Sequence, residues 1–82
     1  MAEEREERRV GLKWRVVKVF NARPAENPYT PRPAKRIMVD VEGIGYRYIY
    51  VPTEEMSPER IAEEVKKRWE EEWQYEMVSG EL

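Results

Sequence analysis

The chain has 82 residues, a net charge of −2 and neither cysteine nor histidine, and 39% of its residues are charged. This length corresponds to one small domain, and the lack of Cys excludes disulfides and thiolate metal sites. The lack of His removes the side chain that ordinarily titrates near neutral pH, so we expect no enzymatic activity, metal or cofactor. No apolar run reaches the roughly 18 residues of a membrane span, and we expect a cytoplasmic protein without a membrane partner.

The first 52 residues divide into a charged tail, a strand and a long loop. Residues 1–9 are almost wholly charged and predict a tail, which leaves residues 10–82 as the folded domain. The run from Leu12 to Phe20 predicts a strand whose alternation is imperfect, unless a bulge near Val16 and Val17 changes the phase. Residues 21–36 contain four of the six prolines and predict an extended loop, because proline lacks a backbone donor and restrains its predecessor.

Two alternating runs follow the loop and predict an antiparallel hairpin over 37–42 and 44–51, with glycines at its turn. The first run places aliphatic side chains on one face. In the second run Arg47, Ile49 and Val51 share one face, and Tyr46, Tyr48 and Tyr50 share the other.

Ser57 and Pro58 predict the start of a helix, with Ser as N-cap and Pro at the first helical position. Apolar residues then recur every four positions and predict the buried stripe of this helix. The stripe consists of Ile61, Val65, Trp69, Trp73 and Met77, joined by Ala62. The glutamates between them, Glu64 included, are expected to face water. The expected fold is therefore α+β, a small antiparallel sheet of three to four strands with one long C-terminal helix packed on one face.

The charge is divided unevenly along the chain, and this division bears on function. Residues 10–52 carry eight Lys/Arg against three Asp/Glu, whereas residues 53–82 carry four against ten. Positive charge interleaved with aromatic rings is typical of proteins that bind single-stranded nucleic acid. The candidate nucleic-acid-binding residues are Trp14, Arg15, Lys18, Arg23, Tyr29, Arg32, Lys35, Arg36, Tyr46, Arg47, Tyr48 and Tyr50.

The segments GLKWRVVKVF and IGYRYIYVP, the proline-arginine loop and a composition poor in Asn, Gln and Cys make the chain similar to the archaeal ThermoDBP-related single-stranded DNA-binding proteins. The resemblance spans Leu12 to Met77. It implies sequence-tolerant binding of single strands in a cleft lined by aromatic and basic groups, and a thermophilic source agrees with the charge-rich composition.

Two alternatives remain open on the sequence. A three-stranded sheet can lie in the major groove of duplex DNA, with Arg47, Arg15 and Lys18 toward bases and phosphates. The aromatic and basic face could instead bind a protein, because Tyr, Trp and Arg are favoured at interaction hot spots. A homodimer through the C-terminal helix, using Trp73 and Met77, is a further expectation.

Overall fold

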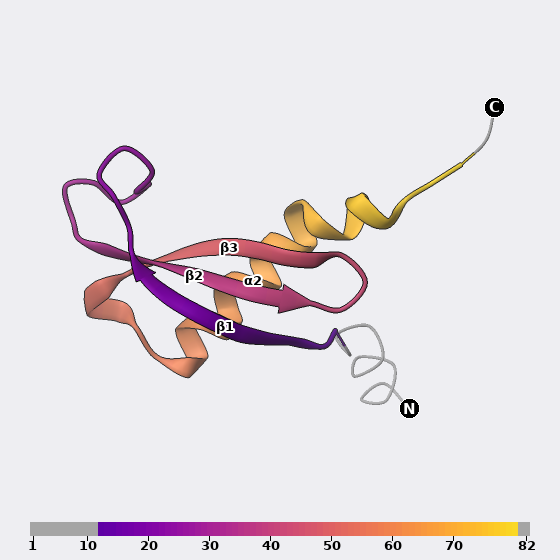
Figure 1. Ribbon diagram of the computed structural model, residues 1–82, viewed down its shortest axis with the longest axis horizontal. Helices are drawn as coiled ribbons and strands as arrows, with labels where there is room; N and C mark the ends of the chain where they lie inside the picture. The colour runs from indigo at the N-terminus through magenta and orange to yellow at the C-terminus, as the bar shows by residue number, and fades with distance from the viewer. Residues whose placement is uncertain (1–11, 81–82) are drawn as a thin grey trace.

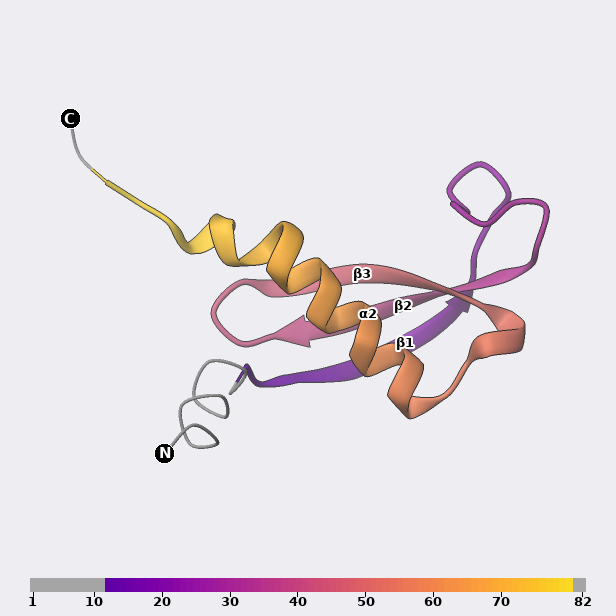
Figure 2. The ribbon, with the colours of Figure 1, turned by 180° about the vertical axis from the view of Figure 1, so that it is seen from behind.

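The computed structural model describes residues 12–80, and the predicted tail at 1–9 lies outside them. Three antiparallel strands, β1 (Trp14–Asn21), β2 (Ala34–Val41) and β3 (Gly45–Pro52), form one sheet in the order β1-β2-β3. A short 3₁₀ turn, η1 (Thr53–Glu55), leads to helix α2 (Pro58–Glu71) and to a second 3₁₀ turn, η2 (Trp73–Met77). The helix crosses one face of the sheet, as the two opposite views show (Figures 1 and 2). The predicted α+β class is confirmed.

The hairpin between β2 and β3 forms where the sequence predicts it. Gly43 and Gly45 have φ angles of 94° and 89°, which glycine adopts without the steric cost that a Cβ atom would add. The register of the pair runs from Ala34 opposite Pro52 to Val41 opposite Gly45. Side chains at alternate positions of both strands therefore share a face over the whole length of the hairpin.

The core lies between the sheet and α2. It contains Ile37, Val39, Val41, Ile49, Val51, Val65 and Trp73. The five strand residues come from one face of β2 and β3, which is the aliphatic face that the alternation predicts. Fully burying such side chains stabilises the fold by about 1.5–3 kcal/mol each.

The helix begins as predicted but is shorter than predicted. The backbone N–H of Arg60 donates to Ser57 Oγ at 3.0 Å, so Ser57 caps the first turn. The helix ends at Glu71, and Glu72 has a non-helical backbone (φ −138°, ψ −56°). A straight helix would carry Trp73 about 80° around its axis from Val65. The break at Glu72 instead lets Trp73 reach the core, where it is 3% exposed.

Two residues of α2 differ from their predicted environment. Ala62, expected in the apolar stripe, is exposed, whereas Glu64, expected in water, is buried. Glu64 can be buried because its Oε1 accepts a hydrogen bond from Arg60 one helical turn earlier, at 3.0 Å. A paired charge costs less to bury than an isolated one.

The loop is shorter than the predicted 21–36. β1 continues to Asn21 and β2 begins at Ala34, so Lys35 and Arg36 lie in the central strand. The four prolines predict a loop as far as Arg36, but the last of them, Pro33, directly precedes the strand and does not interrupt it. Within the loop, the Asn27 side chain accepts from the Tyr29 N–H and donates to the Arg32 carbonyl, both at 2.7 Å. The loop is thus held by its own hydrogen bonds.

Candidate nucleic-acid interface

The surface of the sheet that faces away from α2 is called here the open face. The pairing of the strands places nine side chains on it in three rows that run across β1, β2 and β3. The first row holds Arg15, Asp40 and Tyr46, the second holds Lys18, Met38 and Tyr48, and the third holds Phe20, Arg36 and Tyr50. Three tyrosines thus line β3, while three cations occupy β1 and β2.

A β-bulge in β1 determines which side chains of that strand lie on the open face. Val16 pairs with Val39 and Lys18 pairs with Met38, so Val17 is an extra residue without a partner opposite. Without the bulge, Lys18 would point to the side of α2, because side chains alternate along a strand. The bulge therefore brings Lys18 and Phe20 to the face that already carries Arg15.

Arg36 is clamped between two aromatic rings of the open face. Its guanidinium carbon lies 4.6 Å from the ring centroid of Phe20 and 4.6 Å from that of Tyr48. The Lys18 ammonium lies 5.2 Å from the same Phe20 ring. The carboxylate nearest to Arg36 is that of Glu26, at 3.7 Å, and Arg36 Nε has no hydrogen-bond partner among the described residues. The guanidinium is held by stacking. Because Nε is buried, an anion would have to bind the terminal nitrogens, of which Nη1 already pairs with Glu26.

The tyrosines of β3 differ in how open they are. Tyr46 is 59% exposed and Tyr48 is 42% exposed, whereas Tyr50 is half-buried. Alternate residues of a strand lie about 6.6–6.8 Å apart. This spacing is close to the length of one nucleotide in a stretched single strand, so successive bases could stack on successive rings.

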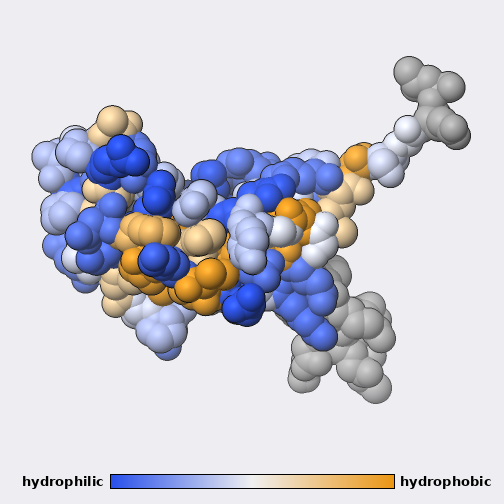
Figure 3. All heavy atoms as spheres, viewed as in Figure 1, coloured by the Kyte–Doolittle hydropathy of each residue, from blue (hydrophilic) through white to orange (hydrophobic). Residues whose placement is uncertain are grey.

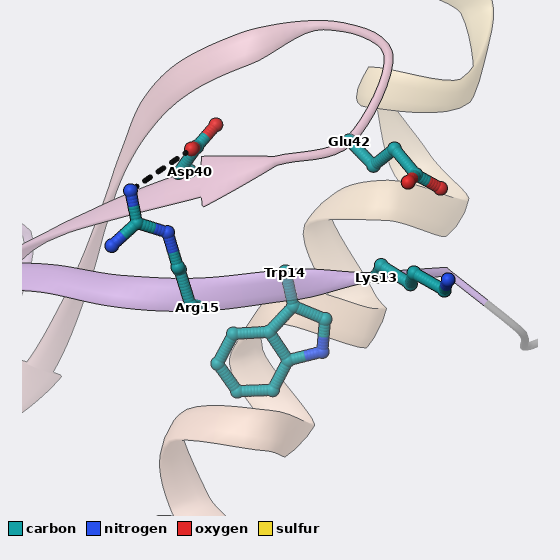
Figure 4. Close-up of a pocket in the computed structure, with 5 residues that line it drawn as sticks. All are labelled: Lys13, Trp14, Arg15, Asp40 and Glu42. Atoms are coloured by element: carbon teal, nitrogen blue, oxygen red, sulfur yellow. Dashed lines mark hydrogen bonds and ion pairs between the residues drawn. The ribbon is translucent and has the colours of Figure 1, made fainter.

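A shallow pocket of about 290 Å³ lies beside the first row, near the hairpin turn. It is lined by Lys13, Trp14, Arg15, Asp40 and Glu42. Arg15 Nη2 lies 3.5 Å from Asp40 Oδ2, and Figure 4 shows this pair bridging β1 and β2. The Trp14 indole lies on the other side of β1 from the Arg15 guanidinium in that view.

Two predicted site residues lie on the opposite side of the sheet. Trp14 pairs with Val41 and packs against the core. Arg47 pairs with Val39 and forms an ion pair with Glu76 of η2, and the hydrogen bonds that Arg47 donates to the Glu76 carboxylate raise the pKa of Arg47. The alternation of β3 already separates Arg47 from the tyrosines, so its assignment to the same site rested on charge alone.

The predicted loop residues do not join the open face as a group. Arg32 forms ion pairs with Glu54 at 2.6 Å and Glu55 at 2.7 Å. Hydrogen bonds from Arg32 and then from Arg60 lower the pKa of Glu55. These contacts fix the loop against η1 and α2, so Arg32 has a structural role.

The other loop positions are divided between structure and solvent. The Tyr29 hydroxyl donates to the Tyr50 carbonyl at 3.4 Å and accepts from Arg60 at 3.3 Å. Lys35 donates to the Asn21 side chain, and Arg23 is exposed. Tyr29 thus covers part of the edge of β3 and is not presented to a ligand.

Sequence reasoning missed Phe20 and Met38. Strict alternation along β1 would place Phe20 on the side of Trp14, and the bulge at Val17 moves it to the open face. Met38 alternates with Ile37 and Val39, so its place on the open face follows from the hairpin pattern. Figure 3 looks onto this face and shows hydrophobic side chains gathered along β1, with hydrophilic residues around them. Val16, Val17 and Val19 of β1 are also exposed, and the register places Val16 and Val19 on the side of α2.

The residues proposed for a dimer also separate in the structure. Trp73 is buried in the core of the single chain and is closed to a second copy. Met77 is exposed and its methyl group lies near Gly43 of the hairpin turn, while Tyr75 and Val78 beside it are exposed as well. The dimer stays a prediction that only these last residues could support.

None of the helices in 12–80 is long and apolar enough to cross a membrane. Within the same range, acidic side chains do not gather into a group that could hold a metal ion.

Comparison of the chain with protein-family models, curated proteins and solved structures finds no match.

Proposed function

We propose that the protein binds single-stranded nucleic acid on the open face, with single-stranded DNA as the first substrate to test. The strand would follow β3, with bases stacked on Tyr46 and Tyr48 and phosphates toward the cations of β1 and β2. Stacking is worth roughly 1–3 kcal/mol per base and tolerates any base, so binding at these positions would be sequence-tolerant.

The observation that carries this proposal is the clamp on Arg36. A guanidinium stacked between Phe20 and Tyr48 loses little conformational entropy when it binds a phosphate, because its orientation is already fixed. It also lies among flat rings that can accept bases. Charge and stacking surface therefore occur on one face, as single-strand binding requires.

The charge around the open face supports the same proposal. Lys13, Arg15, Lys18 and Arg36 outnumber the three carboxylates beside them, Asp40, Glu42 and Glu26, whereas exposed glutamates cover much of α2. A polyanion would therefore be attracted to the open face and repelled from parts of the helix, which orients docking.

The proposal is tested by titrating a fluorescent oligo-dT with the protein at several salt concentrations. Four phosphate contacts predict that log K falls with log salt with a slope of about −3, because each contact on a single strand contributes about 0.7. A duplex of equal length should compete weakly, since its bases are not free to stack. Absence of binding at low salt would contradict the proposal, and preference for duplex would favour major-groove binding by the sheet.

A further inference from the structure

The pocket beside the first row carries charges of both signs at one end of the open face. Arg15 lines it from β1 and Lys13 from the residue before that strand, whereas Asp40 lines it from β2 and Glu42 from the turn after β2. Asp40 is the cross-strand partner of Tyr46, the most exposed of the three tyrosines of β3. A base stacked on Tyr46 would therefore have its edge beside this pocket.

The charged groups of the pocket are available to a ligand. The Arg15–Asp40 contact, at 3.5 Å, is longer than the 2.7–3.2 Å of an ordinary N–H···O bond. The two side chains are 68% and 35% exposed, respectively. Exposed ion pairs of this kind are weak, so either partner can turn toward a ligand at little cost.

The chemistry of the pocket fits a base edge with adjacent donors and acceptors. Guanine presents N7 and O6, which accept hydrogen bonds from Arg or Lys, and it presents the N1–H and the N2 amino group, which donate to a carboxylate. Thymine and uracil have a single N–H donor, and adenine and cytosine have a single amino group. Guanine is therefore the base that uses both signs of charge most fully.

We infer that the pocket selects guanine at one position of the bound single strand. The inference rests on the proposed function, because it requires a base stacked on Tyr46. Asp40 accepts from N1–H and the N2 amino group, and Arg15, with Lys13, donates to O6 and N7. The remaining positions of the strand stay sequence-tolerant.

The experiment compares oligo-dT with oligo-dT that carries one central dG, one central inosine or one central 7-deazaguanine. Inosine lacks the N2 amino group, and 7-deazaguanine lacks the N7 acceptor. We expect the dG oligonucleotide to bind about tenfold more tightly than oligo-dT, and each analogue to lose a large part of this gain.

The variant Asp40→Asn identifies the carboxylate. It should abolish the discrimination between dG and inosine, and Glu63→Gln, on the exposed face of α2, should leave that discrimination in place. Equal affinity of the wild-type protein for all four oligonucleotides would overturn the inference and leave the proposed function intact. Binding of none of them at low salt would overturn both.

Discussion

The guanidinium of Arg36 lies 4.6 Å from the ring centroid of Tyr48 on the neighbouring strand. Phe20 lies equally close to the same guanidinium, so the cation is held between the two rings. In the proposed complex a base would stack on the side of Tyr48 that the cation does not occupy. The open face therefore combines aromatic rings with a cation that lies between two of them. Charge and stacking can be separated by substitutions that alter one of them at a time.

Tyr46 offers the cleanest test of stacking, since it is the most exposed tyrosine of β3 and does not take part in the Arg36 clamp. Tyr46→Ala should weaken the binding of oligo-dT by roughly 1–3 kcal/mol and leave the salt slope nearly unchanged. Fluorescence titration at three salt concentrations measures both quantities. The matched control is Tyr75→Ala, which removes a 63% exposed tyrosine from η2 and should bind like the wild type. Equal losses in both variants would argue against the open face.

Arg36 tests the phosphate contacts. Arg36→Ala should weaken binding and make the salt slope shallower by somewhat less than one unit, because one phosphate contact is lost. Arg36→Lys keeps the charge but lacks the planar guanidinium that stacks between the rings. Compared with Arg36→Ala, it should restore the salt slope more fully than the affinity. The control is Arg47→Ala, on the other side of the sheet, which should leave the slope as it is. If the slope changes in the Arg47 variant and not in the Arg36 variants, the nucleic acid binds on the α2 side of the sheet, which contradicts the proposal.

The sequence predicts most of the fold because its local signals agree with one another. The Ser57 cap, the glycines of the hairpin and the alternation in β3 each specify a local geometry that the structure contains. Local signals do not predict the position of the bulge at Val17 or the end of α2 at Glu71. Both depend on how distant segments of the chain pack together in the core. The bulge decides whether Lys18 and Phe20 join the site, so the candidate site was less predictable than the fold.

Trp73 tests the packing that supports the sheet. Trp73→Ala should lower the free energy of unfolding by about 3–5 kcal/mol, because it removes a large side chain of η2 that packs in the core and is 3% exposed. Urea denaturation followed by circular dichroism measures the change. Val78→Ala, at an exposed position five residues after Trp73, should stay within about 0.5 kcal/mol. A mild effect at Trp73 would contradict the described end of the core.

Acid should destabilise the fold through two carboxylates. Hydrogen bonds from Arg32 and Arg60 lower the pKa of Glu55, and a hydrogen bond from Arg47 lowers the pKa of Glu76. A carboxylate with a lowered pKa stabilises the folded state above its ordinary pKa of 4.5, and this contribution is lost as the pH falls through the lowered value. The melting temperature should therefore decrease as the pH is lowered below about 4.5.

The acid limb should be less steep in Arg32→Ala, because the largest cause of the Glu55 shift is then absent. Between pH 6 and 8 the melting temperature should be nearly constant, since the sequence contains no histidine. Thermal melts of the two proteins from pH 3 to 8 provide the comparison. Identical acid limbs would show that the Arg32 ion pairs are not maintained in solution.

The central claim is that the open face holds the bases of a single strand, and the ring resonances of the tyrosines test it most directly. In an NMR titration with oligo-dT at low salt, the ring protons of Tyr46 and Tyr48 should shift upfield as bases stack on them, while those of Tyr75 stay in place. Shifts at Tyr75 with unchanged resonances at Tyr46 and Tyr48 would contradict the account.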